Sequence, residues 1–167
     1  MQVPSTSTDP ASVLDRLVSD ALPDDRGLGA WRAFLRAHAS LMRELSTDLA
    51  MKTRLPLGDF DALFQLGLAG GDLRMTDLAA RTFSSRSAMT RRVDRMVEEG
   101  LVERTTSAAD GRGVVIALSE AGLARLMEAV PVHVNGVSRL FIERFDDQEL
   151  EFLQRALEKV TLSRSFG

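Results

Sequence analysis

Apolar residues recur at helical spacing along both ends of the chain. The longest stripe predicts a helix from about residue 29 to 52 with one buried face, because its members fall at i, i+3, i+4 and i+7. They are Trp31, Phe34, Leu35, His38, Leu41, Met42, Leu45 and Leu49. A shorter stripe predicts a helix over 13–21, and a third predicts one from Phe60 to the Gly70–Gly71 pair, which breaks it.

The pattern near the C-terminus is helical again. Ser119 is the expected N-cap of a helix whose apolar stripe runs to Phe141, and Pro131 within it is expected to kink or split that helix. Asp146, followed three residues later by Glu149, is typical of a capping box at the start of one more helix. The chain therefore begins and ends with predicted helices.

The rhythm changes in the middle of the chain. Leu73–Met75 predicts a very short strand, after which Thr76 is expected to cap a two-turn helix. Ser85 is expected to cap a longer helix that reaches Glu99, and Gly100 is its C-terminal stop. Two short helices joined by a tight turn indicate a helix-turn-helix.

Two β-rich runs follow these short helices, over 101–106 and 114–118. Small residues and glycines fill 107–113 between them, as expected of a hairpin tip. The predicted fold class is mainly α: a winged helix-turn-helix with a short β-hairpin wing, flanked by long helices.

Composition narrows the class of protein. With 167 residues and 44% apolar residues, one compact domain is expected. The absence of cysteine excludes disulfides, thiolate metal sites and thiol oxidation as a switch. The chain also lacks an apolar run of about 18 residues and a secretory start, so we expect a cytoplasmic protein with no membrane partner.

The net charge of −3 conceals a basic segment. From Arg81 to Arg95 the chain carries five arginines and one acid, Asp94, so this stretch is +4 and the remainder is −7. Attraction for phosphate depends on the local field, and the segment is therefore a candidate footprint for nucleic acid. The alternative is a solvated, arginine-rich helix face.

A helical wheel separates the two sides of the helix over 85–99. With Val93 at the centre of the buried side, Met89, Met96 and Val97 face the core. Ser87, Ala88, Arg91, Asp94 and Arg95 face away from it. A helix of this kind reads the major groove, so Arg91 and Ser87 are expected at base edges, and Arg95 and Arg86 at phosphates. The predicted DNA-contacting set on this helix is Ser85, Arg86, Ser87, Thr90, Arg91 and Arg95.

The hairpin tip adds a second candidate contact. Arg112 stands at the end of a narrow ribbon, where it is expected to enter a minor groove, and Asp110 is expected to orient its guanidinium through a charge-assisted hydrogen bond. The alternative is an ordinary Asp-Gly turn with a solvated arginine.

Three stretches together resemble one protein family. MTDLAAR (75–81), SRSAMTRRVDRMVEEGLV (85–102) and DGRGVVIALSEAG (110–122) are similar, in order and spacing, to the MarR (multiple antibiotic resistance regulator) family of bacterial transcription factors. The resemblance implies a homodimer, interlocked through terminal helices, on double-stranded DNA with a pseudo-palindromic operator. It also implies that Arg112 contacts the minor groove with support from Asp110. Phe83 and Ser84 replace the family's usual Gly-Leu, so Phe83 is expected to supply the core contact of the turn.

On this resemblance the chain is expected to have four parts. They are a disordered N-terminus over 1–10, N-terminal dimerisation helices over 11–55, a DNA-binding lobe over 56–119, and C-terminal dimerisation helices over 120–167. The expected function is a transcription regulator, a repressor whose operator binding is relieved by a small ligand. The alternative is a winged-helix interaction or adaptor module without ligand-controlled DNA binding.

Five residues are candidates for binding such a ligand, which in this family is often an aromatic or phenolic anion. They are Trp31, His38, Phe60, Phe64 and His133. An apolar cleft with few polar groups suits a ligand of that type. The alternative is that these aromatic rings pack in the core or a dimer interface and that each histidine is satisfied by a neighbouring acceptor.

An enzyme is not expected. The chain has no tyrosine, no cysteine, no glycine-rich phosphate loop and no Ser/His/Asp arrangement of recognisable spacing. Asp59 and Asp61 flank Phe60 and point in different directions on a helix, so they do not form a paired-carboxylate site. No cofactor and no metal site are expected, because two histidines alone make a weak metal site.

Overall fold

The computed structural model describes residues 9–21, 25–106 and 114–161. The chain divides into two compact units, residues 1–42 and 43–167. The hairpin tip, with Asp110 and Arg112, lies outside the described residues, as does most of the N-terminal stretch over 1–10.

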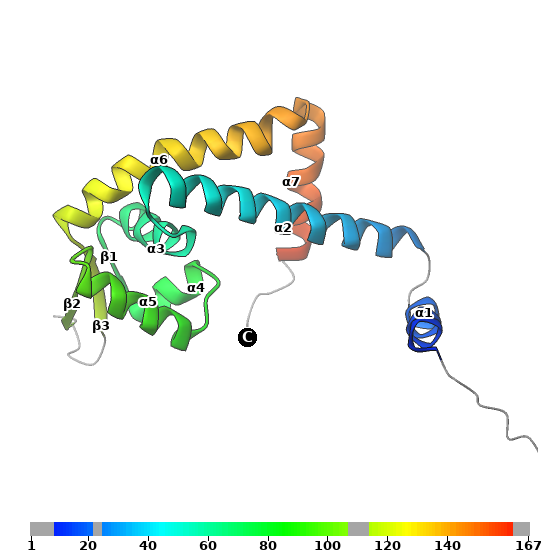
Figure 1. Ribbon diagram of the computed structural model, residues 1–167, viewed down its shortest axis with the longest axis horizontal. Coiled ribbons are helices and arrows are strands. Elements are labelled where there is room, and N and C mark those ends of the chain that lie inside the picture. The colour runs from blue at the N-terminus through cyan, green and yellow to red at the C-terminus, as the bar shows by residue number, and fades with distance from the viewer. Residues whose placement is uncertain (1–8, 22–24, 107–113, 162–167) are drawn as a thin grey trace, which may run out of the picture. The chain divides into compact units, whose positions relative to one another are not determined.

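The first unit contains α1 (Pro10–Ala21) and most of α2 (Asp25–Thr53), so both predicted N-terminal helices are confirmed (Figure 1). Within a single copy, the apolar stripe of α2 is not buried along most of its length. Trp31 is 56% exposed and Phe34 is 45% exposed, whereas only Leu45 and Leu49, both in the second unit, are buried. Helical periodicity identifies which face is apolar but does not determine what covers it.

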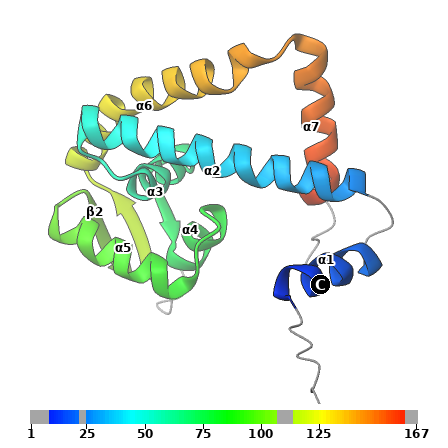
Figure 2. The ribbon, with the colours of Figure 1, turned by 45° about the vertical axis from the view of Figure 1, so that its right-hand side comes forward.

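The second unit holds the remaining elements (Figures 1 and 2). They are α3 (Leu57–Leu68), β1 (Asp72–Arg74), α4 (Met75–Arg81), α5 (Arg86–Glu98), β2 (Val102–Thr106), β3 (Val114–Leu118), α6 (Glu120–Leu140), the 3₁₀ turn η1 (Ile142–Arg144) and α7 (Asp147–Thr161).

The three strands form one small antiparallel sheet in the order β1-β3-β2. Ile116 of β3 is fully buried and pairs with Leu73 of β1 on one side and Arg104 of β2 on the other. The predicted short strand thus joins the hairpin, and the fold is a winged helix-turn-helix.

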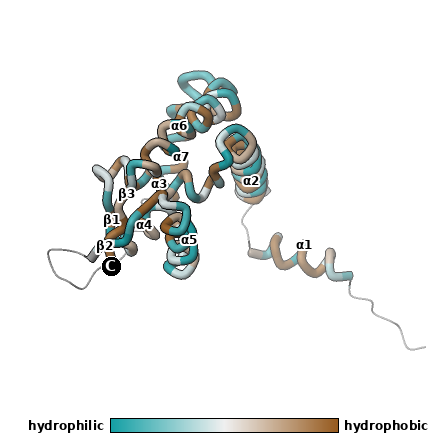
Figure 3. Tube along the Cα trace, turned by 60° about the vertical axis from the view of Figure 1, so that its left-hand side comes forward, coloured by the Kyte–Doolittle hydropathy of each residue, from teal (hydrophilic) through white to brown (hydrophobic). Residues whose placement is uncertain are grey.

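The core lies between the sheet and the helices α3, α4 and α5. Its largest buried side chains include Phe60, Leu63 and Leu66 of α3 and Met89 of α5. Helix α6 packs on α3. It also contacts the C-terminal part of α2, where the Arg139 guanidinium donates a hydrogen bond to the Asp48 carboxylate at 3.0 Å. In Figure 3, α5 is predominantly teal and white, because only one side of this helix is apolar.

Three predicted caps are confirmed. The Ser85 hydroxyl accepts a hydrogen bond from the amide of Ala88 at 3.2 Å, and the Ser119 hydroxyl accepts one from the amide of Gly122 at 2.9 Å. The capping box before α7 is reciprocal. The Asp146 amide donates to the Glu149 carboxylate at 3.0 Å, and the Glu149 amide donates to the Asp146 carboxylate at 2.8 Å.

Two local predictions need correction. Thr76 does not cap α4, because β1 leads directly into the helix, which begins at Met75 with Arg74 in the N-cap position and without a side-chain cap. Pro131 does not split α6, which continues on both sides of it. Proline removes one backbone donor without ending this helix, and Ala129 and Gly136 on either side of it are buried.

Candidate nucleic-acid interface

Helix α5 presents two different sides. Met89, Val93 and Met96 are fully buried, as the helical wheel predicts. Val97, predicted on the same side, is 37% exposed, because it lies at the edge of the buried face in the last turn of the helix. The buried side fixes α5 to the core and leaves the other side open to solvent.

The N-terminal half of the open side carries the predicted reading residues. Ser87 and Arg91 are exposed, and within the described residues the Arg91 guanidinium has no hydrogen bond or ion pair. The Thr90 hydroxyl donates to the Arg86 carbonyl at 2.9 Å, so its oxygen remains as an acceptor for a base or an ordered water. The Ser85 hydroxyl caps the helix and lies 3.3 Å from the hydroxyl of Ser87.

A concavity of about 570 Å³ lies beside α5. Its lining residues come from β1, α4, α5, β2 and β3. They are Arg74, Met75, Thr76, Arg86, Thr90, Arg104 and Val114. Three guanidinium groups line this one surface, which makes it positive and suited to a phosphate backbone.

Two of these arginines were missed by sequence reasoning. Arg74 and Arg104 lie 30 positions apart, and neither belongs to the basic segment over 81–95. The sheet brings them together, because Arg74 pairs with Val115 and Arg104 pairs with Ile116 on opposite edges of β3. Knowledge of which strands pair would have indicated them, but the β-rich stretches of the sequence do not specify their pairing.

An ion pair joins α5 to the sheet. A guanidinium nitrogen of Arg104 lies 2.5 Å from a carboxylate oxygen of Asp94, and both side chains are partly exposed. Since Arg104 lies on β2, this pair fixes the base of the hairpin relative to the helix.

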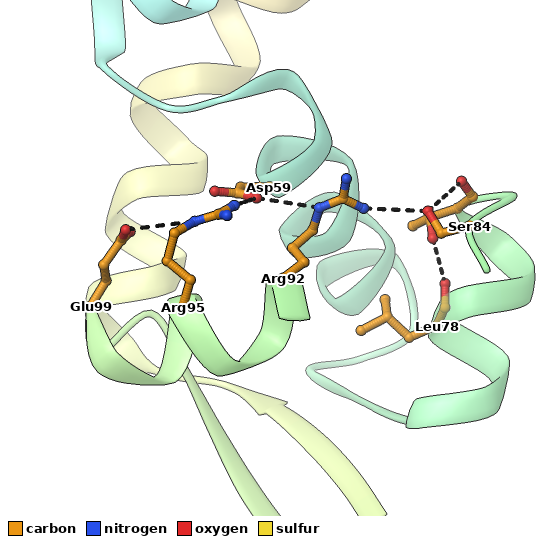
Figure 4. A network of polar contacts seen from close by, with 7 residues as sticks. Asp59, Leu78, Ser84, Arg92, Arg95 and Glu99 are labelled. Atoms are coloured by element: carbon orange, nitrogen blue, oxygen red, sulfur yellow. Dashed lines mark hydrogen bonds and ion pairs between the residues drawn. The ribbon is translucent and has the colours of Figure 1, made fainter. Parts of the chain in front are cut away.

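A second group of charged side chains lies between α5 and α3 (Figure 4). Asp59 is 1% exposed, and its Oδ1 accepts a hydrogen bond from Arg95 Nη2 at 2.5 Å. The same oxygen lies 3.4 Å from Arg92 Nε. The hydrogen bond and the charge of Asp59 raise the pKa of Arg95 above its usual range. Asp61 is exposed, so the two carboxylates lie on different sides of α3, as predicted. The phosphate contact of Arg95 stays a prediction, and in the structure its guanidinium is directed to Asp59.

The turn before α5 differs from the expectation. Phe83 does not supply a core contact, because its side chain is 98% exposed. Its backbone has φ 51°, the left-handed conformation that glycine adopts most easily, and this conformation directs the side chain to solvent. Ser84 instead faces inward, where its hydroxyl accepts a hydrogen bond from Arg92 at 3.3 Å.

Three of the five candidate ligand residues come together in the second unit. The rings of Phe60 and Phe64 lie 5.6 Å apart between centroids, and those of Phe60 and His133 lie 4.5 Å apart. Phe60 is a core residue, whereas His133 is half-buried and its Nδ1 has no hydrogen-bond partner among the described residues. Burial lowers the pKa of His133, against the opposing charge of Asp61.

The other two candidates lie in the first unit. Trp31 stacks on Phe34 at 6.0 Å between centroids, and Phe34 stacks on His38 at 6.3 Å. These rings form an exposed aromatic row along α2. The role of all five residues in ligand binding stays a prediction.

Among the described residues there is no helix that is both long and apolar enough to cross a membrane. They also include no cluster of three or more His, Cys, Asp or Glu side chains that could hold a metal ion.

Comparison with known proteins places the chain among regulators. The MarR family model matches residues 55–113. AbsC, a MarR family transcriptional regulator from Streptomyces coelicolor, has a similar structure, with 31% identity, a TM-score of 0.80, and coverage of 85% of this chain and 96% of AbsC. Sco3205, another MarR family regulator from that organism whose structure contains DNA, shares the fold at 24% identity and a TM-score of 0.81, over 86% of this chain and 91% of its own.

A curated relative matches over a shorter stretch. It is the HTH-type transcriptional repressor YetL of Bacillus subtilis (strain 168), which is 29% identical over 85 residues, or 51% of this chain and 50% of that protein. The match therefore spans about half the length of this curated relative.

Proposed function

The chain belongs to the MarR family of transcriptional regulators, and on this premise we propose that it binds operator DNA sequence-specifically and represses transcription until a small ligand releases it. The observation that carries the proposal is the open side of α5. Ser87 and Arg91 are exposed on a capped helix whose opposite side is buried, which is how a recognition helix enters the major groove.

The neighbouring charges support the same role. Arg86 and Thr90 of α5 line the concavity that also contains Arg74 and Arg104, so base-reading and phosphate-binding groups lie next to each other. Arg112, supported by Asp110, is proposed to extend this surface into the minor groove.

The proposed regulator is a homodimer on a pseudo-palindromic operator. Helices α2 and α7 expose large apolar side chains, which supports their burial against a second copy. In α2 these are Trp31, Phe34 and Leu35, and in α7 they are Phe152, Leu157 and Val160. Two copies related by a two-fold axis would present their α5 helices to half-sites about one helical turn apart.

The proposed effector is a small aromatic or phenolic molecule. In the second unit, Phe60 and Phe64 offer stacked rings and His133 offers a buried nitrogen without a partner among the described residues. In the first unit, Trp31 and His38 are separate aromatic candidates. Thermal-shift screening of aromatic carboxylates and phenols tests this, since a ligand that favours the folded state raises its apparent stability.

Arg91→Ala is the direct test of DNA reading. With duplexes selected by the protein from a random library, we expect a loss of about 1–3 kcal/mol on the selected site and a smaller loss on random duplex, because a base contact carries sequence information. Fluorescence anisotropy at several salt concentrations measures both.

Arg125→Ala is the matched control, because it removes one partly exposed arginine of α6 with the same change in charge. Equal losses on selected and random DNA would make Arg91 a phosphate contact. Absence of salt-dependent DNA binding by the unmodified protein would contradict the proposed function and favour an adaptor module.

A further inference from the structure

One ionisable group of the second unit is fully buried and is not part of the proposed DNA-contacting surface. Asp59 lies in the first turn of α3 and is 1% exposed. Removing a carboxylate from water is costly unless it is paired, and its Oδ2 has no hydrogen-bond partner among the described residues. Well-packed apolar side chains often stabilise such a site as much as a buried ion pair does, so stability alone does not explain this aspartate.

Both partners of Asp59 come from the recognition helix. Arg92 and Arg95, three residues apart on α5, converge on the same oxygen, Oδ1, across the contact with α3 (Figure 4). Helix α3 is shaped for this contact, since a Cβ on Gly58 would overlap the guanidinium of Arg92. Arg92 also donates to Ser84, which ties the turn before α5 into the same network.

These contacts divide the open side of α5. Ser87, Arg91 and Arg95 follow one another at intervals of four residues and so form one stripe along the helix. The first two are exposed without an ion pair within the described residues, whereas Arg95 is drawn to Asp59. The apolar contacts beneath α5 include two flexible methionines and are non-directional, but hydrogen bonds to a buried carboxylate constrain the rotation of a helix.

We propose that Asp59 is a positioning residue, which sets the rotation of α5 for base reading and keeps Arg95 away from DNA phosphates. This rests on the proposed function, because it concerns how the same surface is presented. In the wild-type complex Arg91 and Ser87 contact bases and Arg74 and Arg86 contact the backbone, while Arg95 stays paired with Asp59 and Arg104 with Asp94. Arg95 Nε also lies 3.9 Å from a carboxylate oxygen of Glu99, in a half-exposed pair within α5, so the two arginines face one buried and one solvent-accessible carboxylate.

The test compares the Asp59→Asn variant with wild type on selected and random duplexes. The near-isosteric amide removes the charge that holds Arg95. We expect the ratio of selected-site to random affinity to fall at least about tenfold, while the slope of log affinity against log salt becomes steeper by about one, because Arg95 is released to a phosphate. A purely structural role would weaken both affinities together and leave the slope unchanged, which would overturn the proposal.

Glu128→Gln is the matched control. It removes the same charge from an exposed ion pair, in which Arg125 lies 3.1 Å from Glu128 on α6. We expect this variant to keep the wild-type affinity ratio and salt slope. If it reproduces the effect of Asp59→Asn, net charge rather than position is responsible, and the proposal is wrong.

The Arg95→Gln variant tests the proposal even if Asp59→Asn does not fold. In Arg95→Gln, Asp59 is still present and keeps Arg92 as its partner. We expect Arg95→Gln to leave random-duplex affinity and the salt slope at wild-type values and, in the Asp59→Asn background, to restore the wild-type slope. A slope reduced by about one in Arg95→Gln alone would identify Arg95 as a phosphate contact and overturn the proposal. Absence of specific binding by wild type would instead contradict the proposed function itself.

Discussion

At the scale of single residues, burial decides what a charged or polar group does. Asp59 and Asp61 are two positions apart, yet one is fully buried against two arginines and the other is exposed. Phe83 is an aromatic residue left in solvent by a left-handed turn, although its type predicts a core contact. Residue type therefore indicates the chemistry available, while the surroundings determine whether it is used.

His133 provides a prediction at this scale. Burial lowers its pKa, so below about pH 6.5 the unfolded chain binds a proton that the folded protein binds only at lower pH. The unfolded state is then favoured, and we expect the free energy of unfolding to fall as pH decreases from 7 to 5. Urea titrations at intervals of half a pH unit measure this.

The His133→Gln variant is the control for that titration. Without the imidazole, this part of the pH dependence should disappear while the remaining carboxylate titration at lower pH is retained. If His133→Gln shows the same decline between pH 7 and 5 as the wild type, another group is responsible.

At the scale of elements, helix caps could be predicted from the sequence, whereas contacts between elements could not. Ser85, Ser119 and the Asp146–Glu149 pair were identified from local sequence because a cap involves residues only two or three positions apart. Arg74 and Arg104 were not identified from the sequence, because only strand pairing brings them to one surface. The recognition helix itself was placed correctly, apart from Val97 at the edge of its buried side.

The start of α6 yields a prediction at this scale. A Cβ on Gly122 would overlap the backbone carbonyl of Leu101, directly before β2. A flexible side chain could move away from the added methyl group, but this backbone cannot. We expect Gly122→Ala to lower the free energy of unfolding by about 1–3 kcal/mol through overpacking, measured by urea denaturation.

Gly29→Ala is a suitable comparison, because a Cβ at Gly29 in α2 meets no atom within 4 Å. Alanine is the better helix former, so this variant should be neutral or more stable by up to about 1 kcal/mol. Unchanged stability in Gly122→Ala would show that α6 can shift away from the sheet at little cost.

At the scale of the whole molecule, a single copy leaves much of its apolar helical surface in water. Trp31 and Phe34 on α2 and Phe152 and Val160 on α7 are all more than 40% exposed. The predicted division into terminal dimerisation helices around a central DNA-binding lobe stays a prediction.

Phe152→Asp tests that assignment. Burying one phenylalanine in an interface contributes about 1.5–3 kcal/mol, so we expect this variant to raise the dissociation constant of the dimer by about tenfold or more. Sedimentation equilibrium should give twice the chain mass of 18.3 kDa for wild type. Gln154→Asp adds the same charge at an exposed polar position of α7 and should dissociate less, and a monomeric wild type would contradict the dimer.

The sequence by itself determined the helices, the short strands, the caps and the order of elements that identify a winged helix-turn-helix. These depend on periodicity and on hydrogen bonds between near neighbours, which a linear pattern contains. Only the tertiary structure decided that Arg95 is directed to Asp59, that three arginines line one concavity, and that Phe83 points to solvent. Such features depend on contacts between segments 30 or more positions apart or on the backbone conformation of one turn, and neither follows from residue type.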